Sequence, residues 1–270
     1  MIRILSDLHF GYSSSRVKAA EQLAPLAEGA EEVLFNGDTV ETRFPQERDR
    51  AREAVAALRN VCHTAGAHAV FLTGNHDPDV TEIHHLELAD GAILVTHGDV
   101  LFHGLSPWST EAAVLRAAHD RELAALGHPE DLTRRLEALR RAARVLEPLG
   151  AKLMPRVKPG LWHALAEHFW PPWRTLRILG GWAQTPFLAN ALAARCVPQA
   201  RCVILGHTHF SGVWRVGGRL VVNTGGFTPM GRPLAAELEG NTLTVRKVVF
   251  AHGLFWPGRA VARRDIGGEA

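Results

Sequence analysis

The feature that most constrains this fold is an alternation of short apolar runs with helical segments along the first hundred residues. The apolar runs occupy residues 2–5, 32–35, 69–73 and 93–96. Between them, residues 16–28 and 46–65 are rich in alanine and leucine and have a helical pattern. Alternating strand and helix signals are typical of an α/β sheet. After a long interval, apolar runs return from residue 202 onward.

A cluster of polar side chains follows each of these runs. The clusters occupy residues 7–9, 37–41, 74–77, 97–99 and, after the run at 202–205, residues 206–209. Glycines beside the clusters suit tight turns and close backbone approach. Since ligand sites of open α/β sheets lie beyond the carboxyl ends of the strands, we expect the five clusters to form one site.

The side chains in these clusters are those that bind transition metals. They offer carboxylate and amide oxygens and imidazole nitrogens, and no thiolate. This mixture favours Mn, Fe, Zn or Co over Mg or Ca, and it is large enough for two ions that share one carboxylate. We expect the site to bind two divalent metal ions, and Mn²⁺ is the ion that we favour among these. Such a site attracts phosphoryl groups and lowers the pKa of a bound water.

Three further residues are candidate catalytic groups. His76 follows Asn75 and is placed to protonate a leaving oxygen or to stabilise the transition state. A carboxylate such as Glu41 or Asp77 could orient its other ring nitrogen.

The five clusters resemble the signature of the calcineurin-like metallophosphoesterase superfamily. That signature reads D-x-H, G-D-x-x-D/E, G-N-H-D/E, a lone His and G-H-x-H, and all five elements occur here in that order. The resemblance covers about residues 1–103 and 200–250. It implies a four-layer α/β/β/α sandwich and hydrolysis of a phosphoester or pyrophosphate bond by a metal-bridged hydroxide.

The resemblance also assigns roles to individual residues. It implies two metal sites that share Asp38, namely Asp7, His9, Asp38 and His209, and Asp38, Asn75, His97 and His207. His76 takes the position of the catalytic histidine, and Glu41 that of the carboxylate that orients it. The substrate-binding positions fall on Asn75, His76 and Arg43. In some members an arginine directly follows the carboxylate, whereas Thr42 separates Arg43 from Glu41 here.

Within the superfamily, the chain is most similar to UDP-2,3-diacylglucosamine pyrophosphatase-like members. It shares their Thr-His-Gly-Asp motif at residues 96–99 and a helical insertion before the last motif. Those enzymes hydrolyse a lipid-linked pyrophosphate, but they have arginine where this chain has His76. The alternatives are a phosphatase or phosphodiesterase for a soluble small molecule or nucleotide, a nuclease, and a non-catalytic metal-binding scaffold.

Residues 107–198 show no strand pattern, and we interpret them as a helical insertion, or cap. It would separate core segments 1–106 and 199–255, with a loose tail at 256–270. Helices are expected from Ser109 to Gly127, from Pro129 to about Pro148, and from Leu161 to Pro171. The second has leucines at helical spacing and arginines on its other faces.

Two interpretations of the insertion remain open. One is an ordinary cap with an apolar face on the core and a solvated basic face. The other is a lid that contacts anionic membrane or admits an acyl chain, chiefly through the Trp-rich residues 169–173.

Composition and charge limit the kinds of binding partner and the cellular compartment that we expect. A formal net charge of +2 and the lack of a recognition motif do not favour nucleic acid. Three cysteines without a Cys-x-x-Cys pair favour a reducing compartment. No signal peptide or convincing membrane-spanning segment is found. We expect a cytoplasmic protein, with peripheral contact at the inner membrane face if the lid interpretation holds.

Overall fold

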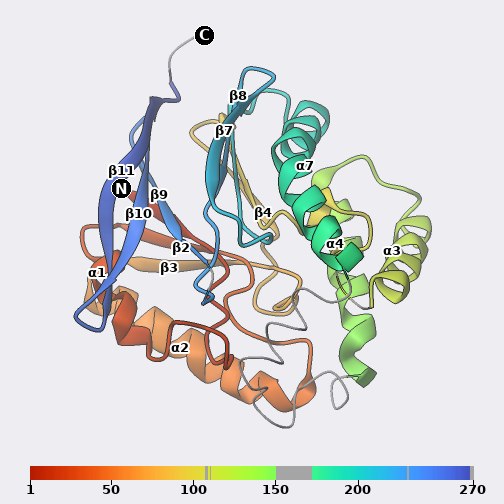
Figure 1. The fold of residues 1–270 in the computed structure, drawn as a ribbon, viewed down its shortest axis with the longest axis horizontal. Coiled ribbons are helices and arrows are strands. Elements are labelled where there is room, and N and C mark those ends of the chain that lie inside the picture. The colour runs from red at the N-terminus through yellow and green to blue at the C-terminus, as the bar shows by residue number, and fades with distance from the viewer. Residues whose placement is uncertain (107–108, 110, 150–171, 230, 268–270) are drawn as a thin grey trace.

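A computed structural model describes residues 1–106, 109, 111–149, 172–229 and 231–267 (Figure 1). Two β-sheets face each other, and helices cover the outer side of each. The first sheet has the order β11-β10-β9-β1-β2-β3 and the second has the order β4-β5-β6-β8-β7. This arrangement confirms the predicted mixed α/β sandwich.

The strands of the first sheet are β1 (Ile2–Leu5), β2 (Glu32–Asn36), β3 (His68–Leu72), β9 (Leu234–Glu239), β10 (Thr242–Ala251) and β11 (Leu254–Asp265). Those of the second are β4 (His85–Leu88), β5 (Ile93–Thr96), β6 (Cys202–Leu205), β7 (Gly212–Val216) and β8 (Arg219–Asn223). The three N-terminal strands β1, β2 and β3 are parallel, as are β5, β6 and β8. Parallel pairing brings the polar clusters to the same edge of each sheet.

The helices divide between the two outer faces. Beside the first sheet lie η1 (Ala20–Leu23), α1 (Ala24–Ala27), η2 (Pro45–Glu47) and α2 (Arg48–Thr64). The remaining described helices are η3 (Asp99–Leu101), α3 (Ala112–Ala125), α4 (Leu132–Ala143), η4 (Arg144–Leu149) and α7 (Pro172–Cys196). In Figure 1, α3, α4 and α7 lie on the side of the second sheet that faces away from the first.

Side-chain alternation along the strands builds three apolar cores. Ile4 of β1 packs between the sheets with Ile93 of β5, whereas the next residue, Leu5, packs with Leu58 of α2. On the second sheet, the alternate residue Leu94 packs outward against the helices of the insertion. The period of two residues in a strand therefore explains why each sheet is apolar on both faces.

The described helices of segment 107–198 form the fourth layer of the sandwich. Leu136 and Leu139 of α4 and Ala189 of α7 belong to the same buried cluster as Leu94 and Val203 of the second sheet. Asp131 begins α4 as its N-cap, accepting a hydrogen bond from the Arg134 amide. In packing, this part of the segment is continuous with the core. The expected helix at 161–171 lies outside the described residues.

Within the segment expected as a loose tail, 256–270, residues 256–265 instead form most of β11. This strand pairs antiparallel with β10 from Thr242↔Asp265 to Ala251↔Leu254. Nearly all of its side chains are exposed or half-buried, so the strand lacks the apolar alternation that would have revealed it. Among the described residues, no helix is both long enough and apolar enough to cross a membrane.

Because α4 covers the second sheet, shortening one of its buried side chains should destabilise the whole fold. We expect Leu136→Ala to lower the free energy of unfolding by about 2–5 kcal/mol, since Leu136 is 1% exposed and its truncation leaves a cavity. Val114→Ala, at an exposed position of α3, is the control and should change the free energy of unfolding by less than about 0.5 kcal/mol. Denaturant unfolding measures both. A separate early transition in Leu136→Ala would contradict a shared core.

Candidate metal centre

The seven predicted metal ligands converge at the carboxyl edge of both sheets. Asp7 and His9 follow β1, Asp38 follows β2, and Asn75 follows β3 of the first sheet. His97 follows β5 of the second sheet, and His207 and His209 follow β6. The site therefore draws on five strand ends, three from the first sheet and two from the second.

Five of these ligands have left-handed backbone conformations. Their φ angles are 53° at Asp7, 47° at His9, 50° at Asp38, 68° at His207 and 55° at His209. A non-glycine residue in this region costs about 1–2 kcal/mol, although Asp and His adopt it more readily than most. The turns aim successive side chains into one volume instead of alternating them across the sheet.

Two glycines admit the ligand carboxylates. A Cβ atom at Gly74 would lie 2.3 Å from Asp38 Oδ1, and one at Gly206 would lie 2.2 Å from Asp7 Oδ2. Any side chain at either position would displace a candidate ligand. The glycines of the third and fifth clusters are therefore part of the geometry of the site.

The ligands form two groups, with Asp38 between them, and a third cluster joins His9 and Asp38 to His76. In one group, His209 Nε2 lies 3.2 Å from Asp7 Oδ1 and 3.1 Å from His9 Nε2. In the other, Asp38 is grouped with His97 and His207. Asp38 Oδ2 lies 3.4 Å from His97 Nε2 and 3.9 Å from His9 Nε2. This carboxylate thus reaches both groups, as a shared ligand must.

The hydrogen bonds around the site fit metal ions. His97 Nδ1 lies 3.0 Å from the Asn36 carbonyl, so it donates there and leaves Nε2 as the ligand atom. His207 Nε2 donates to the Leu105 carbonyl at 2.9 Å, which assigns its Nδ1 to a metal. Asn75 Oδ1 is buried and accepts no hydrogen bond from the described residues. A cation would satisfy that oxygen.

Burial and charge set the protonation of the histidines. Burial lowers the pKa of His9 to about 3, and burial together with the neighbouring His97 lowers that of His207 to about 4. Both therefore stay neutral, the form that ligates metals. Burial also opposes a charge on His97, but the Asp38 carboxylate outweighs it and raises the pKa of His97 to about 10. Metal binding must release that proton.

His76 lies beside the ligands and is held from behind by Glu41. Glu41 Oε2 lies 3.0 Å from His76 Nδ1. Arg43 donates to both oxygens of Glu41, at 3.0 and 2.6 Å, and its Nη2 lies 2.7 Å from His76 Nδ1. Burial raises the pKa of Glu41, but the hydrogen bonds from His76 and Arg43 outweigh it and lower this pKa to about 2. The Glu41 carboxylate and the Arg43 guanidinium thus both lie at Nδ1, and Nε2 remains for a substrate.

Asp77 does not orient His76. Its carboxylate, which is fully buried, accepts hydrogen bonds from the backbone amides of Gly74, Asp38, Thr39 and Val40. It therefore ties the loop after β3 to the loop after β2. Burial, with the Asp38 charge beside it, raises the pKa of Asp77 to about 6.

The structure adds one residue that sequence reasoning missed. Arg140 of α4, expected on a solvated basic face, is 2% exposed and forms an ion pair with Asp99, which is fully buried. Burial raises the pKa of Asp99, but the Arg140 charge outweighs it and the net shift is downward. Asp99 follows the ligand His97 by two residues, so the insertion reaches the edge of the metal centre.

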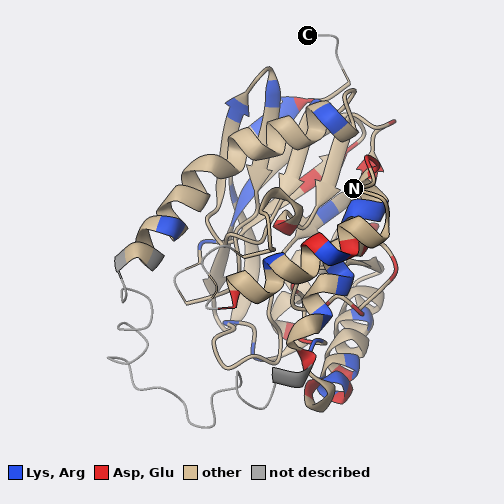
Figure 2. Cartoon of the chain, turned by 90° about the vertical axis from the view of Figure 1, so that its right-hand side faces the viewer, with Lys and Arg blue, Asp and Glu red and all other residues tan. Residues whose placement is uncertain are grey.

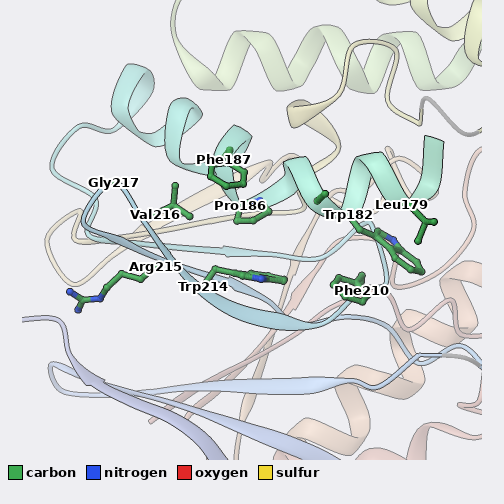
Figure 3. Close-up of a pocket in the computed structure, with 10 residues that line it drawn as sticks. Leu179, Trp182, Pro186, Phe187, Phe210, Trp214, Arg215, Val216 and Gly217 are labelled. Atoms are coloured by element: carbon green, nitrogen blue, oxygen red, sulfur yellow. The ribbon is translucent and has the colours of Figure 1, made fainter. Parts of the chain in front are cut away.

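An apolar groove of about 720 Å³ lies between α7 and the segment 210–217 (Figure 3). Trp182, Pro186 and Phe187 line it from α7, facing Phe210 and Trp214. Phe210 follows the ligand His209 and stacks on Trp182, with the ring centres 4.6 Å apart. Trp182 Nε1 also donates to the Thr208 carbonyl, between ligands His207 and His209. The groove is thereby attached to the loop that carries two ligands.

A family model and several solved structures match this chain. A family model described as calcineurin-like phosphoesterase matches residues 1–211. A dimetal phosphatase from Danio rerio is 11% identical with a TM-score of 0.45, covering 91% of this chain and 95% of that one. Vps29 from Entamoeba histolytica in complex with Zn²⁺ is 15% identical with a TM-score of 0.41, covering 98% and 99%. A predicted phosphoesterase from Streptococcus pneumoniae is 15% identical with a TM-score of 0.41, covering 98% and 96%. No curated protein matches the chain.

Proposed function

The chain belongs to the calcineurin-like phosphoesterase family, and from this premise we propose that it hydrolyses a phosphoester or pyrophosphate bond with two divalent metal ions. The observation that carries the proposal is the convergence of carboxylates and imidazoles from both sheets, with Asp38 within reach of both groups. The proposed ligand sets are Asp7, His9, Asp38 and His209, and Asp38, Asn75, His97 and His207. Mn²⁺ is the proposed ion. Bound dications supply positive charge for phosphoryl oxygens and lower the pKa of a water molecule.

His76 is the proposed general acid. Its ring is 26% exposed, so a substrate can reach it, and Nδ1 is engaged by Glu41. In the protonated ring, Nδ1–H donates to Glu41 and Nε2–H is available to the leaving oxygen. The Glu41 carboxylate, 3.0 Å from Nδ1, fixes the plane of the ring.

Arg43 contributes to the proposed mechanism from behind His76. Its side chain is 11% exposed and donates to both oxygens of Glu41. In this position it orients the Glu41–His76 pair. Direct phosphate binding by Arg43, the role that the resemblance implies, stays a prediction.

The first test separates chemistry from metal binding. We expect His76→Ala to keep both metal ions but to lower kcat by about 10²–10⁴-fold, the range typical of a lost general acid. Asp38→Ala removes the shared ligand and should abolish both metal uptake and activity. Metal content by elemental analysis and turnover of bis-p-nitrophenyl phosphate with Mn²⁺ measure the two effects. Wild-type turnover by His76→Ala would refute its role, and a wild-type protein with metal but no turnover would favour a non-catalytic scaffold.

We propose further that the organic part of the substrate is apolar, as in a lipid-linked pyrophosphate. Support comes from the groove between α7 and β7, whose side chains are mostly apolar and include Phe210, the residue after the ligand His209. Leu179, Phe187 and Phe210 in its lining are 49%, 62% and 42% exposed, so part of this apolar surface faces water. Covering it with a substrate would gain about 25 cal/mol per Å² buried.

The groove variant Leu179→Ser/Phe187→Ser tests this substrate class. Both residues are distant in sequence from the metal ligands and are already exposed, so the fold should tolerate the change. We expect kcat/KM for a UDP-linked diacyl sugar in mixed micelles to fall at least tenfold, which needs only about 1.4 kcal/mol of lost contact. Turnover of bis-p-nitrophenyl phosphate should stay within about twofold of wild type. An unchanged rate with the lipid would favour a soluble substrate.

We also propose that α7 touches an anionic membrane. Figure 2 shows this helix crossing the outer face with few charges, and its sequence contains three arginines and no acidic residue. Trp173 and Leu176, near its N-terminal end, are 59% and 68% exposed. An exposed apolar surface with basic neighbours is typical of interfacial helices. Of the Trp-rich residues 169–173, only Pro172 and Trp173 lie within the described part of the chain.

Co-sedimentation with vesicles tests the membrane contact. We expect Trp173→Ala/Leu176→Ala to bind phosphatidylglycerol vesicles several-fold more weakly than wild type, because it removes the two exposed apolar groups near the N-terminal end of α7. The control is Val249→Ala/Phe250→Ala on β10, which alters residues of similar exposure away from α7. Equal loss in both variants, or in neither, would contradict a role for α7.

A further inference from the structure

The buried ion pair between Arg140 and Asp99 joins the insertion to the metal centre. Arg140 lies on α4, and Asp99 opens the short helix η3 immediately after the ligand His97 and Gly98. Arg140 Nη2 donates to Asp99 Oδ2. Both side chains are almost completely buried, although they come from segments 41 residues apart.

The loop that Arg140 holds contacts both histidines of the second candidate metal site. Residues 97–105 contain the ligand His97 itself. At the other end of the loop, the Leu105 carbonyl accepts the Nε2–H of His207 at 2.9 Å and so decides which nitrogen of His207 faces the metal. Within the loop, amides of Leu101, Phe102 and Leu105 donate to the carbonyls of Gly98, Asp99 and Phe102. A shift of Asp99 would therefore move both histidines.

Anchoring of α4 alone does not account for this pair. Moving two charges out of water costs several kcal/mol per ion, and apolar residues of the same size often hold two segments equally well. Leu136 and Leu139 of the same helix already pack on the second sheet. In addition, Nε and Nη1 of Arg140 and Oδ1 of Asp99 are buried without a hydrogen bond to the described residues. A buried ion pair therefore stabilises the attachment of α4 no better than apolar residues would.

We propose that Arg140 is a positioning residue for the second metal ion, acting through Asp99 on the loop that presents His97 and His207. This inference rests on the proposed function. It assigns to the insertion a part in building the metal centre, besides covering the second sheet. The other ion would be held by Asp7, His9 and His209 together with the shared Asp38, and none of these four residues lies on the loop, so we expect its affinity not to depend on Arg140.

The experiment is titration of metal-free, full-length protein with Mn²⁺ by isothermal calorimetry. We expect wild type to bind two ions, and Arg140→Met to bind one normally and the other about 10–100-fold more weakly, the usual effect of losing an outer-shell partner. Arg140→Lys, which keeps the charge, should recover part of this loss. Arg141→Met is the matched control, because Arg141, the next residue of α4, is 41% exposed and pairs with Glu137; this variant should bind both ions as wild type does.

A second variant guards against simple unfolding of the first. Arg140→Met leaves the buried Asp99 charge uncompensated, whereas Arg140→Met/Asp99→Asn removes both charges and should recover thermal stability. If the pair positions the loop for metal, the double variant stays deficient at one site although it is stable. Normal binding of both ions by the stable double variant would overturn the inference. Wild-type protein that binds no Mn²⁺ would instead overturn the proposed function, and the inference with it.

Discussion

The Asp38 carboxylate faces His97 across the junction of the two sheets, and the geometry of the metal centre depends on this contact. Asp38 follows β2 of the first sheet and His97 follows β5 of the second, with 3.4 Å between Oδ2 and Nε2. Both side chains are buried, where an unpaired charge would cost far more than at the surface. The His76 amide donates to the other oxygen of Asp38 at 2.8 Å. The third strand end is thereby tied to the same carboxylate.

Much of this site could be predicted because its geometry is local. A parallel strand must release its chain at the carboxyl edge, so polar residues placed directly after apolar runs meet there. Asp7, Asp38 and His97 are found where that rule puts them. The Gly74 and Gly206 positions also follow from the sequence, since only glycine leaves room for the carboxylates beside them. The helix at residues 48–64 and its apolar face follow in the same way from periodicity.

What the sequence did not reveal depends on contacts between distant segments. Periodicity places Arg140 on a polar face of α4, but it does not show that this part of the face meets a buried carboxylate. In the same way, the insertion has amphipathic helices, yet only the structure shows that they cover the second sheet. The outward residues Leu94 and Val203 required some cover, since a parallel sheet is buried on both faces. Which segment covers these residues depends on contacts between parts of the chain that are far apart in sequence.

Strand β11 was not predicted for a different reason. Most of its side chains stay exposed when it pairs with β10, so its sequence lacks an apolar alternation.

The division of ligands between the sheets links metal binding to the stability of the fold. Asp7 and His9 of the first sheet face His209 of the second, and Asp38 of the first faces His97 and His207 of the second. Each proposed ion would therefore bind residues of both sheets, and a ligand that binds only the folded state stabilises it. The left-handed turns at five of the seven ligands cost free energy in the metal-free protein. Metal coordination would offset that cost at the place where it arises. The apolar core between the sheets brings the strand ends together, and the metals would then hold those ends in the geometry that the turns impose.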